Sequence, residues 1–191
     1  DILSTDPDID VVGTAPDAMI GLRKIEALSP DVLTLDVEMP GMDGLTFLER
    51  LMKSNPMPVV MVSAYTEAGS DAAIRSLELG AVDVVEKPRY EVREGLSNLS
   101  ELIIDKVKGA ALAQVASPST RFFEHNTGES AVISVTQESL GHAPLEQLVA
   151  IGASTGGPQA IRQVLEVLPA SMPPVLVVQH ITPSFTESFA K

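Results

Sequence analysis

The sequence contains no cysteine and no tryptophan, and only 4% of its residues are aromatic. The lack of cysteine excludes disulfides and thiolate metal sites, which suits a protein of the cytoplasm. No apolar run approaches the roughly 18 residues that a membrane-spanning helix needs, and the chain does not begin with a signal-peptide pattern. These absences favour a globular, cytoplasmic protein without membrane insertion.

Basic residues are also scarce, with 13 Lys and Arg against 26 Asp and Glu. Residues 1–89 carry a net charge of −9 (7 basic, 16 acidic), and residues 90–191 carry −4 (6 basic, 10 acidic). Neither half has the basic footprint of a nucleic-acid-binding protein. The chain begins at Asp1 without an initiator methionine, so we expect a piece of a longer protein.

Residues 1–89 alternate short apolar runs with segments of helical periodicity. This pattern predicts a parallel α/β sheet with helices on both faces. The apolar runs are continuous, as in strands covered on both sides. The expected strands are 11–12, 32–35, 59–62 and 82–85. The expected helices carry the apolar stripes Ala18, Leu22 and Ile25; Leu45, Leu48 and Met52; Ile74 and Leu77; and Leu96, Leu99, Ile103 and Val107.

The periodicity is lost after about residue 113, where Ser, Thr, Pro, Gly and Asn accumulate. We interpret residues 114–147 as an interdomain linker, in which 131–135 could alternatively form a short strand. From residue 148 the pattern of strand, helix and strand returns. Residues 148–191 therefore predict one βαβ unit of a second α/β domain, too short to bury a core alone.

Three polar residues, Asp36, Ser63 and Lys87, lie just past the ends of three successive strands. The carboxyl ends of parallel strands form one crevice, so we expect these side chains to converge. A carboxylate, a hydroxyl and an ammonium together suit a phosphoryl group: Asp36 as nucleophile, Lys87 as counter-charge and Ser63 as hydrogen-bond donor. Alternatively, each is an ordinary polar residue at a strand end.

The stretch Leu35-Asp36-Val37-Glu38-Met39-Pro40-Gly41-Met42-Asp43-Gly44 and the tripeptide Glu86-Lys87-Pro88 resemble the two signatures of response-regulator receiver domains. The resemblance covers residues 1–113. It implies a flavodoxin-like fold with strand order 2-1-3-4-5, phosphorylation of Asp36 by a histidine kinase, and a phosphoryl switch at Ser63 and Lys87. It also implies Mg²⁺ bound by Asp36, the main-chain carbonyl of Glu38 and an acidic pair.

That acidic pair belongs at the end of the family's first strand, which would precede Asp1. We therefore expect an N-terminally truncated receiver, with the first strand and its acidic ligands missing. Residues 1–5 then correspond to the end of the first helix. Val84 departs from the pattern as well, because many receivers carry an aromatic switch residue there.

A second candidate site begins at Ser154, which directly follows the apolar run 148–153. The two glycines after it and Pro158 predict a tight turn and the first turn of a helix. His180 ends the next predicted strand. A right-handed crossover brings both residues to the same sheet edge, where the histidine can take the serine proton during attack on an acyl carbon.

Other interpretations of Ser154 and His180 remain open at this point. Residues 152–156 match the Gly-x-Ser-x-Gly elbow of α/β-hydrolases, although in that fold an acid precedes the histidine in chain order. The glycines could instead cradle a phosphate, but the Gly-x-Gly-x-x-Gly and Gly-Lys-Ser/Thr patterns are absent. His180 could also be a structural histidine.

The stretches Ile151-Gly152-Ala153-Ser154-Thr155-Gly156-Gly157-Pro158 and Val178-Gln179-His180-Ile181 resemble the catalytic domain of the chemotaxis methylesterase (CheB) family. A receiver, a linker and this segment follow that family's domain order. The resemblance implies phosphorylation-regulated hydrolysis of glutamate methyl esters on chemoreceptors, often with deamidation of receptor glutamines, and no cofactor for the esterase. Ser154 matches the nucleophile, His180 the general base, and Thr155 and Gly156 the turn near the oxyanion site.

The family's triad aspartate lies far downstream of these motifs. The last aspartate of this sequence is Asp105, in the predicted final helix of the receiver. We therefore expect a C-terminally truncated esterase, inactive as the fragment given. The implied partners are a histidine kinase and methyl-accepting chemoreceptors. A response regulator with a non-enzymatic output, such as DNA binding, is the alternative, but it predicts a basic recognition helix that is not present.

Overall fold

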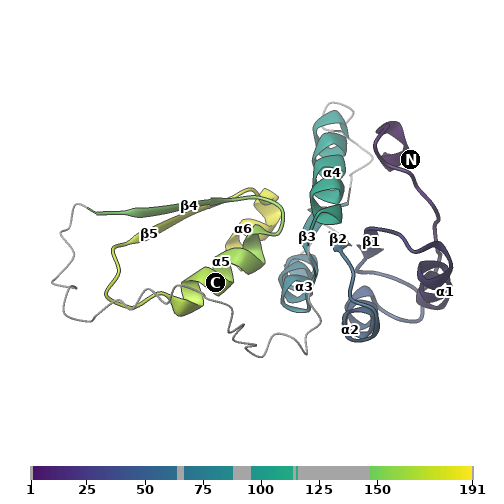
Figure 1. The fold of residues 1–191 in the computed structure, drawn as a ribbon, viewed down its shortest axis with the longest axis horizontal. Helices are drawn as coiled ribbons and strands as arrows, with labels where there is room; N and C mark the ends of the chain where they lie inside the picture. Colours follow the sequence, from purple (N-terminus) through teal and green to yellow (C-terminus); the bar gives the residue numbers. More distant parts are fainter. Residues whose placement is uncertain (1, 64–66, 88–95, 114, 116–146, 191) are drawn as a thin grey trace, which may run out of the picture.

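The structure is a computed structural model that describes residues 2–63, 67–87, 96–113, 115 and 147–190. It contains two parallel sheets (Figure 1). The first has the order β1-β2-β3, and the second pairs β4 with β5. The strands are β1 (Leu33–Asp36), β2 (Val59–Ser63), β3 (Asp83–Glu86), β4 (Val149–Ala153) and β5 (Val175–Gln179). The predicted α/β class with parallel sheets is confirmed.

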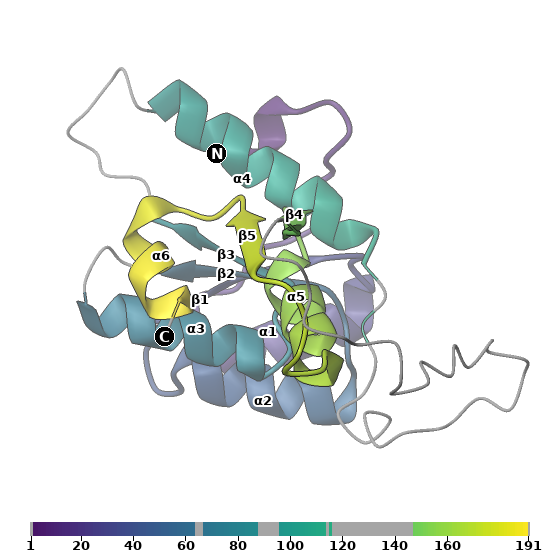
Figure 2. The same ribbon diagram turned by 90° about the vertical axis from the view of Figure 1, so that its left-hand side faces the viewer.

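Helices cover both faces of the first sheet, as the continuous apolar strands predict (Figures 1 and 2). One face packs against α1, α2 and α3, and the other packs against α4 and the short 3₁₀ helix η1. The bounds are η1 (Leu3–Thr5), α1 (Ala18–Leu28), α2 (Gly44–Ser54), α3 (Glu67–Glu78) and α4 (Leu96–Ala111). Each predicted apolar stripe therefore lies on a helix.

Aspartate caps decide where two of these helices begin. Asp17 accepts a hydrogen bond from the main-chain N–H of Ile20 at 2.8 Å, and Asp43 accepts one from Thr46 at 2.9 Å. Each carboxylate satisfies a main-chain donor that the first turn leaves without an intrahelical partner. The starts of α1 and α2 follow directly from these residues.

The predicted strand at residues 11–12 is wrong, because the structure has no strand there and Val12 is 48% exposed. In the order 2-1-3-4-5 this segment would pair with the first strand of the receiver. The described residues contain no such strand, so the apolar pair has no ladder to join. The predicted linker at 114–147, including the alternative strand at 131–135, lies almost entirely outside the described residues.

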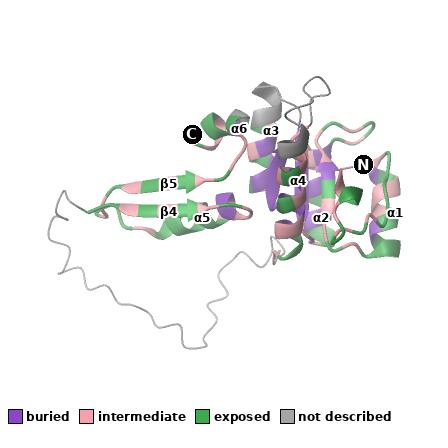
Figure 3. Cartoon of the chain, turned by 90° about the horizontal axis from the view of Figure 1, so that it is seen from above, coloured by how far each residue is buried: buried purple, intermediate pink, exposed green. Residues whose placement is uncertain are grey.

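The second part of the chain consists of β4, α5 (Gly157–Val167), β5 and α6 (Pro183–Phe189). Residues of β4 and β5 alternate between half-buried and exposed, and Leu176 and Val178 are 51% and 64% exposed. Figure 3 shows that the buried residues gather instead around the first sheet. The βαβ unit therefore has no full core of its own.

Helix α6 was not predicted, and it joins the two parts. Its Phe185 is fully buried in the hydrophobic cluster that α1, α2 and α3 form with the first sheet. No helix in the described ranges is both long and apolar enough to cross a membrane.

Candidate functional sites

The end of β1 brings Asp36 next to Lys87. The Lys87 Nζ lies 2.8 Å from Asp36 Oδ2, and it also lies 3.7 Å from a carboxylate oxygen of Glu38. Asp36 Oδ1 accepts a hydrogen bond from the main-chain N–H of Glu38 at 2.9 Å. Both partners of the Asp36–Lys87 ion pair are about one-third exposed, so a phosphodonor can reach the carboxylate.

Ser63 ends β2, the central strand of the first sheet, and is fully buried. Its carbonyl accepts a hydrogen bond from the Lys87 N–H at 2.8 Å, which continues the pairing of β2 with β3. The three predicted residues therefore lie at one edge of the sheet, on adjacent strand ends. Ser63 is the buried member, and Asp36 and Lys87 are the accessible ones.

Gly44 is a residue of this site whose role the sequence reasoning missed. A Cβ at this position would overlap the carbonyl oxygen of Asp36, and the Gly44 N–H donates to the Val37 carbonyl at 2.9 Å. The start of α2 is thus packed directly against the main chain of the predicted phosphoacceptor. The Asp43-Gly44 pair at the end of the quoted signature was the available signal.

A magnesium ion prefers oxygen ligands, and Asp36 with the Glu38 carbonyl offers donors of this type. In the described part of the chain, however, no three His, Cys, Asp or Glu residues are grouped so as to hold a metal ion. The residues described here therefore do not complete the magnesium site that the receiver family implies.

The second site lies at the paired ends of β4 and β5. Ala153 pairs with Gln179, and the His180 N–H donates to the Ala153 carbonyl at 2.8 Å. Ser154 and His180 follow directly, and Ser154 Oγ lies 3.2 Å from His180 Nδ1. Both side chains are exposed. The structure therefore brings the predicted nucleophile and base within hydrogen-bonding distance.

The turn after Ser154 depends on its glycines. Gly156 has a φ of +75°, a left-handed conformation that favours glycine. The Gly157 N–H donates to the Ser154 carbonyl at 2.7 Å and closes the turn at the start of α5. Thr155 and Gly156 therefore lie next to the serine, where the sequence analysis expected them.

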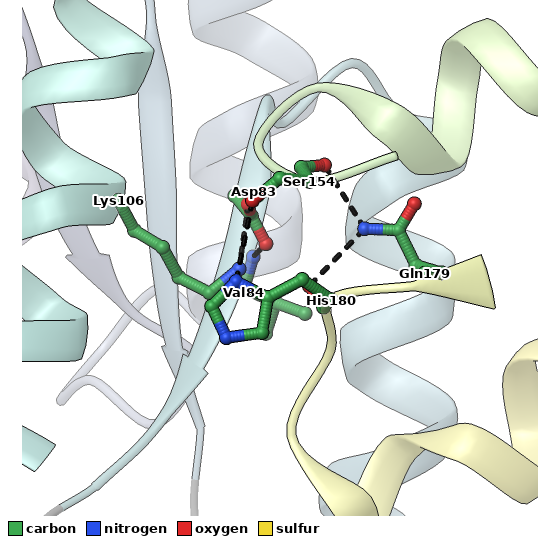
Figure 4. Close-up of polar contacts among 6 residues, drawn as sticks. All are labelled: Asp83, Val84, Lys106, Ser154, Gln179 and His180. Atoms are coloured by element: carbon green, nitrogen blue, oxygen red, sulfur yellow. Dashed lines mark hydrogen bonds and ion pairs between the residues drawn. The ribbon is translucent and has the colours of Figure 1, made fainter. Parts of the chain in front are cut away.

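Gln179 is a second residue that the sequence reasoning missed. Its side-chain Nε2 donates to the carbonyl of Ser154 at 2.9 Å and to that of His180 at 3.1 Å (Figure 4). Only its place before His180 at the end of a strand could have drawn attention to it.

The Ser154 turn also packs against the first part of the chain. The Gln159 side chain of α5 donates to the carbonyls of Leu77 and Ala81, at 2.6 and 3.2 Å, at the end of α3. The Thr155 side chain lies so close to Gly109 of α4 that a Cβ there would be 3.1 Å from it. The segments that carry Asp36 and Ser154 are thus in contact.

Comparison with known proteins agrees with both halves of this arrangement. Residues 1–96 match the response regulator receiver domain family, and residues 149–191 match the CheB methylesterase family. Among solved structures, the response regulator domain of Thermotoga maritima CheB is similar, with 35% identity and a TM-score of 0.52. That match covers 59% of this chain and 84% of the solved one.

Curated relatives match along the whole chain. Proteins from Pectobacterium atrosepticum and Bordetella parapertussis, both named protein-glutamate methylesterase/protein-glutamine glutaminase, are 50% and 48% identical to it. Each match covers 100% of this chain and 52% of the relative, so the chain spans about half the length of these relatives. The chain belongs to the response regulator receiver domain family, and its residues 149–191 are similar to the CheB methylesterase family.

Proposed function

We propose that the protein carrying this chain is a phosphorylation-regulated protein-glutamate methylesterase, acting in the cytoplasm on methylated chemoreceptors. The observation that carries the proposal is the 3.2 Å distance between Ser154 Oγ and His180 Nδ1 at neighbouring strand ends. The Asp36–Lys87 pair in the same chain supplies the means of regulation.

The hydrolysis proceeds by acyl transfer. Ser154 Oγ attacks the carbonyl carbon of the glutamate methyl ester while His180 Nδ1 accepts the hydroxyl proton. The C–O bond to the methoxy group then breaks, and methanol leaves with the proton from His180. Water, deprotonated by the same histidine, hydrolyses the acyl-serine and leaves a free glutamate carboxylate. The same attack on a glutamine amide releases ammonia, which accounts for the second activity in the relatives' names.

The oxyanion of the tetrahedral intermediate needs hydrogen-bond donors near Ser154. The Gly157 N–H is already used by the Ser154 carbonyl. In the described part of the chain, the N–H groups of Thr155 and Gly156 donate no hydrogen bond to another group. We assign these two donors to the oxyanion.

Regulation follows from the contact between the two parts. Asp36 takes up a phosphoryl group from the kinase, and the Lys87 ammonium balances the added charge. In the unphosphorylated protein, the C-terminal ends of α3 and α4 lie against the segment that follows Ser154 and restrict the approach of a receptor helix. Phosphorylation loosens this contact.

The test uses the protein at the full length of its relatives and measures methanol release from methylated receptor, with and without a small-molecule phosphodonor. We expect stimulation by the phosphodonor, no stimulation in Asp36→Ala, and unchanged stimulation in Asp31→Ala, an exposed aspartate before β1. Stimulation that survives Asp36→Ala would contradict the regulatory proposal. A protein with no esterase activity would favour the non-enzymatic output.

The nucleophile is tested separately. Ser154→Ala should abolish methanol release, whereas Ser171→Ala, at an exposed serine between α5 and β5, should leave it unchanged. Unchanged turnover in Ser154→Ala would show that another group attacks the ester.

A further inference from the structure

The side chain of Gln179 connects the two residues of the Ser154–His180 pair through their main chains. Its Nε2 donates to the Ser154 carbonyl at 2.9 Å and to the His180 carbonyl at 3.1 Å. The Ser154 carbonyl also accepts the Gly157 N–H, so both of its lone pairs are used. One amide group therefore ties together the turn after β4 and the residue after β5 (Figure 4).

The amide can lie in one orientation only. If its oxygen and nitrogen were exchanged, the oxygen would face two carbonyl oxygens and the two hydrogen bonds would be lost. In the observed orientation Oε1 is buried, and it has no hydrogen-bond partner among the described residues. Burial of an unpaired oxygen lowers the stability of the folded protein. The two hydrogen bonds from Nε2 must therefore offset this loss.

Gly157 makes room for this side chain. A Cβ at position 157 would overlap Oε1 of Gln179 and would lie 2.8 Å from the Ala153 Cβ. The φ of this glycine is not in the left-handed region, so close packing rather than backbone conformation requires glycine here. Gly157, the first residue of α5, thus leaves the space that the Gln179 amide at the end of β5 occupies.

We propose that Gln179 is a positioning residue for the esterase reaction, which holds Ser154 Oγ and His180 Nδ1 at the distance needed for proton transfer. The inference rests on the proposed function. Gln179 does not touch the reacting atoms, and it acts through the main chains of the two residues that do. Ser154 and His180 are both exposed. The pairing of β4 with β5 brings their main chains together, and the two Gln179 hydrogen bonds add to this pairing at the strand ends.

The test replaces Gln179 with methionine, which keeps the length of the side chain and removes the donor. Activity is measured as methanol release by the full-length protein with saturating phosphodonor, and labelling of Ser154 by a fluorophosphonate is measured in parallel. We expect kcat to fall about 10- to 100-fold, since small misplacements of reacting groups have effects of this size. The labelling rate should fall by the same factor, and KM should change less than about twofold. Gln163→Met, at an exposed glutamine of α5, is the matched control and should match wild type.

A second variant tests the same geometry without changing Gln179. Gly157→Ala should displace the amide and lower kcat by a similar factor, and the double variant Gly157→Ala/Gln179→Met should be no slower than the slower single variant. Thermal unfolding shows which variants fold, and only the kcat values of folded variants are compared with wild type. Wild-type kcat and labelling in a folded Gln179→Met, or in Gly157→Ala if the first does not fold, would overturn the proposal.

A purely structural role would give a different pattern, in which Tm falls while the kcat of the folded protein stays at the wild-type value, and this result also overturns the proposal. Ser154→Ala separates the two levels of inference. If Ser154→Ala retains activity, the proposed function itself fails. If Ser154→Ala is inactive and Gln179→Met is fully active, only the role of Gln179 fails.

Discussion

At the scale of single residues, the proposed phosphoacceptor site depends on close packing as much as on charge. Asp36 is held by Lys87 on one side and by the Glu38 N–H on the other. Behind it, Gly44 leaves no space for a side chain against the Asp36 carbonyl. The position of the carboxylate therefore depends on a residue that carries no functional group.

Replacing Gly44 with alanine should displace the main chain at Asp36. We expect a loss of about 1–3 kcal/mol in the free energy of unfolding, as for other overpacked sites, and slower phosphorylation by a small-molecule donor. Urea unfolding and phosphoprotein formation measure the two effects. Gly152→Ala is the control, because a Cβ there meets nothing within 4 Å, and its stability should stay within about 0.5 kcal/mol of wild type. A Gly44→Ala protein as stable as this control would contradict the argument.

Ser154 and His180 could be predicted as neighbours because parallel pairing with a right-handed crossover leaves little freedom in where strand ends lie. Asp36 and Lys87 follow the same rule. Gln179 could not be predicted, because the alternation of a strand gives the face of a side chain but not its rotamer. Its two hydrogen bonds form because the side chain turns back over the end of the sheet, and no residue pattern predicts that conformation.

At the scale of elements, α2 begins at a cap that responds to pH. The pKa of Asp43 lies below its ordinary value, because the main-chain N–H and then the hydroxyl of Thr46 donate hydrogen bonds to its carboxylate. A lowered pKa in the folded state means that the ionised cap stabilises the protein fully above the ordinary pKa of 3.8. This contribution is lost as the pH falls through the lower pKa of the folded protein.

Asp43→Ala should therefore cost about 1 kcal/mol at pH 7, and the difference from wild type should shrink at pH 3. Urea unfolding at the two pH values measures it. Asp43→Asn is the control, because asparagine caps a helix without ionising, and it should be close to wild type at pH 7. A cost in Asp43→Ala that is equal at both pH values would refute the role of the ionised cap.

A buried ion pair joins β3 to α4. Lys106 Nζ lies 2.7 Å from Asp83 Oδ2, and the two side chains are 2% and 1% exposed. Asp83 Oδ1 also accepts the Val84 N–H at 2.8 Å. Removal of one partner leaves the other charge buried without a counter-charge. The resulting loss of unfolding free energy is much larger than the net stabilisation by the intact pair.

We expect Lys106→Met to lose about 3–5 kcal/mol of unfolding free energy, and Asp83→Asn/Lys106→Met to recover much of that loss. Asparagine keeps an oxygen for the Val84 N–H. Arg75→Met is the matched control, because the Arg75–Glu78 pair is exposed, and it should change stability by less than about 1 kcal/mol. Denaturant titration decides, and a double variant less stable than Lys106→Met would contradict the explanation.

The elements themselves were largely predictable, because the periodic stripes and the Asp17 and Asp43 caps are local signals. The two exceptions depend on partners distant in sequence. Residues 11–12 have the composition of a strand but no described neighbour to pair with. Helix α6 is short, and it is held by Phe185 in a cluster built by another part of the chain.

At the scale of the whole molecule, several contacts among the described residues join the receiver to the segment carrying Ser154. They include the Gln159 hydrogen bonds to the end of α3, the packing of Thr155 on Gly109, and Phe185 in the receiver core. The sequence did not predict any of these contacts, because surfaces that meet between domains show no periodicity.

Gln159→Ala should weaken this contact and raise the activity of the unphosphorylated full-length protein. Two hydrogen bonds of about 1 kcal/mol each correspond to an increase of about 10- to 30-fold, whereas the phosphorylated activity should not change. Methanol release without phosphodonor measures the effect, and Gln163→Ala should leave it at the wild-type level. Equal basal activity in both variants would show that the contact does not restrain the enzyme.

In the proposed regulation, the burial of Phe185 strengthens the contact that phosphorylation must loosen. If opening of this contact returns the ring to water, it costs about 1.5–3 kcal/mol, which lowers the open population by about 10- to 160-fold. A smaller side chain would raise the activity of the unphosphorylated protein. A larger contact would require more phosphorylation for the same activity. Under the proposed regulation, this one aromatic ring therefore affects both the basal activity and the response to phosphorylation.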